Sequence, residues 1–128
     1  MRLKAGVLAT ASLLLLVACA TVPTVVKPVP NPPNLVGKWK GEWGGNMVHP
    51  IEMVLDTQRE GIVSGRMTFP HSNYAAVSGT IGAAQDGSVW VLLDVGGREF
   101  PLKVVSQKRL EGTGRSHGHF GPVTLTRE

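Results

Sequence analysis

The chain has 128 residues, and its 13 Lys and Arg residues exceed its 9 Asp and Glu residues by four. That length bounds it to one modest domain, and the positive excess is too small to indicate a nucleic-acid partner. With 17% charged and 42% hydrophobic residues, it fits neither a disordered polyelectrolyte nor a multi-span membrane protein. The single cysteine excludes an internal disulfide and any Cys-x-x-Cys metal or redox site.

Residues 1–18 have the parts of a secretory signal. Arg2 and Lys4 precede an apolar run over 5–18, which is shorter than the ~20 residues that a membrane-spanning helix needs. The run ends at Cys19, and Leu16-Val17-Ala18-Cys19 resembles the lipobox of bacterial lipoproteins. The resemblance implies cleavage before Cys19, a diacylglyceryl group on its thiol and acylation of the new amino terminus. The alternative is an ordinary signal peptide and an incidental buried thiol.

Ala20 follows the cysteine, where aspartate would favour inner-membrane retention in that family. The resemblance therefore implies an outer-membrane anchor, with the domain facing the periplasm. Residues 19–34 form the expected tether, because 21–34 contain five prolines and no apolar periodicity. Such a segment favours polyproline II at ~3.1 Å per residue and could hold the domain up to roughly 45 Å from the lipid.

From residue 35 to 128 the apolar residues recur with a period of two, broken by Gly, Asp-Gly and Pro about every ten residues. This pattern is typical of short antiparallel strands. Gly96-Gly97 predicts a tight hairpin that pairs Leu93 with Phe100 and Val91 with Leu102. We expect eight strands, at 35–43, 51–56, 63–69, 77–81, 88–95, 99–106, 110–116 and 122–127. Closure removes both sheet edges, so the expected fold is all-β, a small antiparallel up-and-down barrel.

Gly37-Lys38-Trp39 resembles the Gly-x-Trp that opens the first strand of lipocalins, within a wider group of eight-stranded barrels that includes avidins. The resemblance implies that Trp39 packs across one barrel end beneath a basic residue of the last strand. Arg127 occupies that place in the sequence and shares its parity with Val123 and Leu125. We therefore expect a cation–π contact between Trp39 and Arg127.

The inward-facing positions carry many large apolar residues, so we expect a filled interior in preference to a deep pocket. The glycines in these strands are expected to mark bends.

The four histidines fall in connections that a meander places at one rim. We expect His49, His71, His117 and His119 at that rim, where His-x-His suits zinc, copper or a haem edge. We favour four solvated loop histidines over a metal site, because the strand parity places His117 and His119 outward.

Other candidate binding residues are Trp90, Tyr74, Asp94 and Glu99. Trp90 has outward parity beside apolar neighbours, which can mark a partner surface, although it could equally lie over its cross-strand partner Lys103. Asp94 and Glu99 flank the 96–97 turn, and Tyr74 lies in a rim loop.

We find no catalytic motif, so the sequence predicts a binding protein and no enzyme. The expected function is that of a lipid-anchored envelope accessory module that binds a protein partner or a small apolar ligand through its rim loops or an outer strand face. A metal or haem binder using the rim histidines and an inhibitor of an exported hydrolase are the alternatives; no nucleic acid and no required cofactor are expected.

Overall fold

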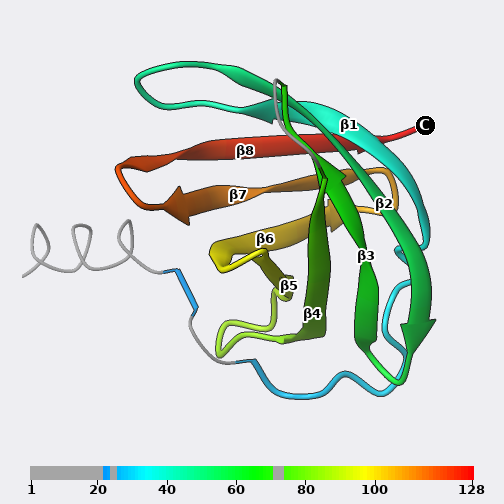
Figure 1. Ribbon diagram of the computed structural model, residues 1–128. Coiled ribbons are helices and arrows are strands. Elements are labelled where there is room, and N and C mark those ends of the chain that lie inside the picture. The colour runs from blue at the N-terminus through cyan, green and yellow to red at the C-terminus, as the bar shows by residue number, and fades with distance from the viewer. Residues whose placement is uncertain (1–21, 24–25, 71–73) are drawn as a thin grey trace, which may run out of the picture.

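The computed structural model describes residues 22–23, 26–70 and 74–128, and its eight strands close into one antiparallel barrel in chain order (Figure 1). This confirms the all-β up-and-down fold. Within the described residues no helix is long and apolar enough to span a bilayer. The strands are β1 (Gly37–Trp43), β2 (His49–Arg59), β3 (Ile62–Thr68), β4 (Ala75–Ala83), β5 (Val89–Val95), β6 (Arg98–Ser106), β7 (Arg109–Ser116) and β8 (His119–Arg127).

Alternation of apolar and polar residues places one face of every strand inside the barrel. Every large apolar residue expected to face inward is buried, except Phe69, Val89 and Val104, which are partly buried and pack against the core. Among the described residues no polar or charged side chain is buried. The core consists of Leu35, Trp39, Trp43, Ile51, Met53, Leu55, Val63, Met67, Val77, Ile81, Val91, Leu93, Val95, Phe100, Leu102, Leu110, Val123 and Leu125.

Pairing between β1 and β8 closes the barrel, with Trp39 opposite Arg127 and Trp43 opposite Val123. The Trp39 side chain is fully buried, and its indole Nε1 donates a hydrogen bond to the Leu35 carbonyl at 3.0 Å. The Arg127 Cζ atom lies 4.7 Å from the centroid of the Trp39 ring. That distance is within the ~6 Å over which a cation is attracted to an aromatic face.

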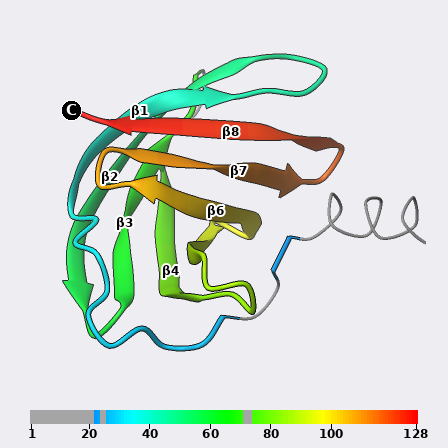
Figure 2. The same cartoon turned by 180° about the vertical axis from the view of Figure 1, so that it is seen from behind.

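The segment before β1 lies against the barrel, which differs from the free spacer expected up to residue 34. Lys27 pairs with Ala83 at the end of β4, with backbone hydrogen bonds of 2.9 and 2.7 Å. Gln58 accepts a hydrogen bond from the Leu35 amide and donates one to the Pro33 carbonyl, both at 2.8 Å. Figure 2 shows this segment running past the lower ends of β4 and β3 before it enters β1.

All eight strands begin one to three residues away from the positions expected from the sequence, and the shifts of the first and last strands have a visible cause. The first strand begins at Gly37 instead of residue 35, because Pro33 and Leu35 are hydrogen-bonded to the Gln58 side chain and the Leu35 side chain is buried against the core. The last strand begins at His119 instead of residue 122, directly after a turn at residues 117–118. The hairpin pairs Leu93–Phe100 and Val91–Leu102 are confirmed.

Candidate functional site: a groove on the outer face of β5 to β8

Cross-strand register aligns four side chains across β5, β6, β7 and β8, close to the rim that carries the β5–β6 and β7–β8 turns. Asp94 pairs with Glu99, Glu99 pairs with Arg115, and Arg115 pairs with Phe120. The order across the sheet is therefore two carboxylates, one guanidinium and one aromatic ring. We call these four residues the charged row.

A second set of outward residues lies two positions further from the rim on each strand. Leu92 pairs with Pro101, and Thr113 pairs with Pro122. Pro101 has no N–H group and cannot donate to a β-ladder, so it contributes only an apolar ring and a carbonyl. We call Leu92, Pro101, Thr113 and Pro122 the apolar row.

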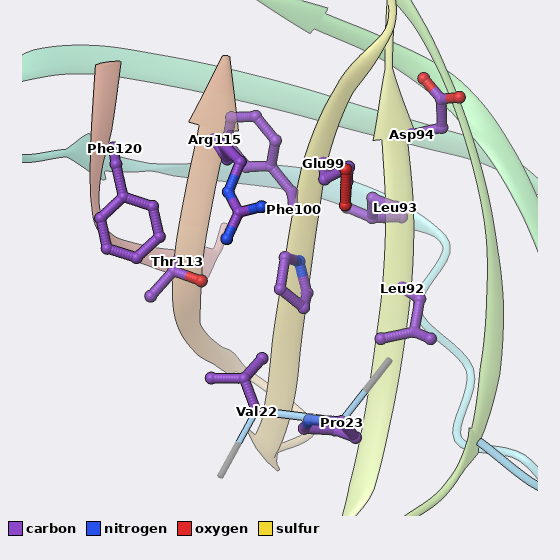
Figure 3. A pocket seen from close by; sticks show the side chains of 11 residues that line it. Val22, Pro23, Leu92, Leu93, Asp94, Glu99, Phe100, Thr113, Arg115 and Phe120 are labelled. Carbon is purple, nitrogen blue, oxygen red and sulfur yellow. The ribbon is translucent and has the colours of Figure 1, made fainter. Parts of the chain in front are cut away.

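A groove of about 360 Å³ lies over these two rows. All of the charged row lines it, together with Leu92, Pro101 and Thr113 of the apolar row and Val22 and Pro23 of the segment before β1. Figure 3 shows Asp94, Glu99 and Leu92 on one side, Arg115, Phe120 and Thr113 on the other, and Val22 with Pro23 across one end. The groove thus combines charges of both signs with an apolar floor.

The charges of the groove are only partly satisfied by the protein itself. Asp94 accepts a hydrogen bond from the Gly97 amide at 2.8 Å, which stabilises the β5–β6 turn. The Arg115 Cζ atom lies 5.7 Å from the centroid of the exposed Phe120 ring. Among the residues that the structure describes, neither Arg115 nor Glu99 makes an ion pair. The guanidinium and the carboxylate therefore remain open to a ligand.

Trp90 lies outside the groove, further along β5. It is half-buried, pairs in register with Lys103, and donates an indole hydrogen bond to the Ser88 hydroxyl at 2.8 Å. Ser88 in turn donates from its hydroxyl and amide to Asp86, and these bonds, the side-chain bond first, lower the pKa of the Asp86 carboxyl. Trp90 is thus fixed by the β4–β5 connection. Tyr74 is 66% exposed between β3 and β4 and does not line the groove.

Two of the four histidines come together at the rim. The rings of His49 and His119 have centroids 5.2 Å apart and both pack against Trp43. A nitrogen of His119, Nε2, lies 2.8 Å from the Gly44 carbonyl oxygen, so that nitrogen is the donor in this contact. His117 is exposed in the turn between β7 and β8.

The outward placement expected for His119 is wrong. The turn at 117–118 changes the parity, so His119 belongs to β8 and points inward with Gly121 and Val123. His71 lies outside the described residues. Within the described ranges no three His, Cys, Asp or Glu side chains are grouped so that they could hold a metal ion.

Comparisons of the chain with models of known protein families, with curated proteins and with solved structures find no match. The described residues form a small, closed, eight-stranded antiparallel barrel with an apolar core and an amphipathic groove on its outer surface.

Two residues of the groove, Asp94 and Glu99, are among the binding residues expected from the sequence, whereas Arg115 and Phe120 are not. Arg115 could have been found from the sequence. It has outward parity on β7, the strand beside Glu99, and oppositely charged residues are favourable cross-strand partners. Phe120 was missed because β8 was expected to begin after it. Cys19 lies outside the described residues.

Proposed function

We propose that the protein is a lipid-anchored envelope module that acts by binding through the groove on the outer face of β5 to β8, without catalysis. The observation that carries this proposal is the contrast between the two sides of the barrel wall. The interior is packed with buried apolar side chains, whereas the outer groove holds unpaired charges of both signs above an apolar floor. The groove is open to a ligand from solvent, whereas the described inward positions are occupied by these core side chains.

The lipid anchor is the second part of the proposal and rests on the sequence around Cys19. Val22, the first residue described, lies at the groove and is 47% exposed. An anchor three residues before it would place the groove close to a membrane. The groove, the anchor and the absence of a catalytic motif support an accessory role in the bacterial envelope.

The rim histidines give less support for a function. His119 packs edge to face on Trp43, the His49 ring is tilted against Trp43, and one nitrogen of His119 already faces a backbone carbonyl. Zinc takes four ligands, three of them from the protein in an open site. The pair supplies at most two of them.

The test uses a photoreactive amino acid placed in the full-length chain, in bacterial cells that export it. One variant carries the group in place of Thr113 on β7, inside the groove. The comparison variant carries it in place of Thr68, an exposed outward residue of β3 that lines a different groove, beside Lys40 and Pro50. We expect adducts from position 113 that are absent from position 68 and that weaken when Arg115 is changed to Ala. Equal adduct yields from both positions would contradict the proposed function.

A further inference from the structure

We propose that the groove is occupied by the headgroups of the phospholipid surface to which the chain is anchored, so that the outer face of β5 to β8 lies on the bilayer. The inference rests on the proposed function, because it names the partner of the same groove. In this arrangement Arg115 binds a lipid phosphate, Asp94 and Glu99 bind an adjacent ammonium group, and Phe120 enters the headgroup layer.

The segment that leads back to Cys19 leaves the barrel at the groove. Val22 and Pro23 line one end of the groove, three and four residues after Cys19. An extended chain spans at most ~3.3–3.6 Å per residue, so Val22 lies within about 10 Å of a lipid attached to Cys19. The groove is therefore the part of the barrel that the anchor holds nearest to the bilayer.

The contacts of the following segment carry the second step. Lys27 is hydrogen-bonded to the end of β4, and Pro33 and Leu35 are hydrogen-bonded to Gln58 on β2. A chain held at these points cannot act as a 45 Å spacer. The short connection to the anchor therefore restricts which outer face of the barrel can contact the bilayer.

The charges of the groove carry the third step. Asp94 and Glu99 are direct cross-strand partners, and like charges in that relation are unfavourable unless a cation neutralises them. Arg115, on the neighbouring strand, has the planar donor geometry that suits a phosphate. A zwitterionic headgroup supplies both charges, a phosphate and an ammonium, at a short separation. Among the described residues, the groove is lined by one cation, Arg115, and by no polybasic cluster of the kind that binds purely anionic lipid surfaces.

The exposed apolar residues carry the last step. Phe120 is 59% exposed and Val22 is 47% exposed, and both lie at the groove. On protein surfaces that lie in the membrane interface, Phe and other apolar side chains enter the boundary between headgroups and acyl chains, while arginine keeps its charge at the headgroups. Figure 3 shows the Phe120 and Arg115 side chains next to one another at one side of the groove.

The experiment measures how far water-soluble reagents reach each face of the lipidated full-length chain in vesicles. Thr113→Cys in the groove and Thr68→Cys on β3 each receive a nitroxide label, since the thiol of Cys19 is blocked by its lipid. Vesicles contain equal parts phosphatidylethanolamine and phosphatidylcholine. We expect a water-soluble relaxation agent to reach the label at 113 much less than the label at 68. In detergent solution both labels should be reached.

Two further arms test the chemistry. Arg115→Ala should lower the equilibrium constant for placing the groove on the bilayer by about tenfold, because a charge-assisted hydrogen bond to phosphate contributes about that factor. The label at 113 should then be reached more often by the water-soluble agent. Vesicles of phosphatidylglycerol alone, which lack the ammonium group, should protect 113 less than the zwitterionic vesicles do.

Equal access to 113 and 68 in every vesicle would overturn the inference, and so would protection that is strongest in phosphatidylglycerol. Those results would leave the proposed function standing if the cellular cross-linking still gave adducts specific to position 113. If position 113 gave no specific adducts and the relaxation agent reached positions 113 and 68 equally, both the proposed function and the lipid inference would be wrong.

Discussion

Replacing Trp39 tests how the barrel end is closed. Trp39 is fully buried, its ring lies under the Arg127 guanidinium, and its indole nitrogen donates to the Leu35 carbonyl. A buried Trp→Ala change costs ~3–5 kcal/mol of unfolding free energy, and small domains have a total stability of ~5–15 kcal/mol. Within that cost, the contact with the cation accounts for ~0.5–2 kcal/mol. We expect Trp39→Ala to remove a large share of the stability.

Trp39→Phe separates packing from hydrogen bonding. It keeps an aromatic ring below Arg127 and removes the donor to Leu35, so the expected loss is ~1–3 kcal/mol, the cost of leaving a buried carbonyl unpaired. The assay is urea unfolding followed by far-UV circular dichroism, which does not depend on tryptophan emission. Val105→Ala, at a residue 49% exposed on β6, is the control and should change stability by less than ~0.5 kcal/mol. A loss below ~1 kcal/mol for Trp39→Ala would refute the proposed closure.

Three further changes probe the seam, the segment before β1 and the anchor. A Cβ at Gly41 would lie 1.6 Å from a backbone oxygen of β8. Gly41→Ala should therefore lower the unfolding free energy, measured in urea, by ~3 kcal/mol or more, and a decrease below ~1 kcal/mol would contradict the close β1–β8 pairing. Gln58→Ala removes the hydrogen bonds to Pro33 and Leu35, each of which contributes ~0.5–1.5 kcal/mol. Limited proteolysis should then cleave the segment before β1 faster while the barrel stays folded, and an unchanged cleavage rate would contradict the attachment of this segment to the barrel. Cys19→Ser should leave the precursor uncleaved and without lipid in intact-mass spectra, whereas an unmodified Cys19 inside the mature native chain would rule out the anchor.

Most of the fold could be predicted because period-two alternation and turn residues act locally. Gly96-Gly97 sets the register of β5 and β6, and alternation from that turn identifies inward residues such as Val91 and Leu102. The start of β8 could not be predicted in the same way. Continuing the parity of β7 through the short turn at 117–118 gave His119 the wrong face and left Phe120 outside the strand.

The groove was less accessible to sequence reasoning because it is made by several strands. Asp94 and Glu99 were found since one hairpin brings them together, but Arg115 joins them only through the β6–β7 register, which contains a bulge near Val104. Val22 reaches the groove through contacts of a proline-rich segment that has no apolar periodicity. Composition predicts that such a segment is extended and does not reveal the surface against which it lies.

Hydroxyl-radical footprinting of the unmodified chain tests the binding face most directly, by comparing two exposed aromatic residues. Phe120 is 59% exposed in the groove and Tyr74 is 66% exposed at the rim, so both should be oxidised readily in the purified protein in detergent. In native envelopes, binding through the groove predicts that oxidation of Phe120 falls sharply while that of Tyr74 is unchanged. Equal oxidation of both residues in the envelope, or protection of Tyr74 alone, would contradict binding through the outer face of β5 to β8.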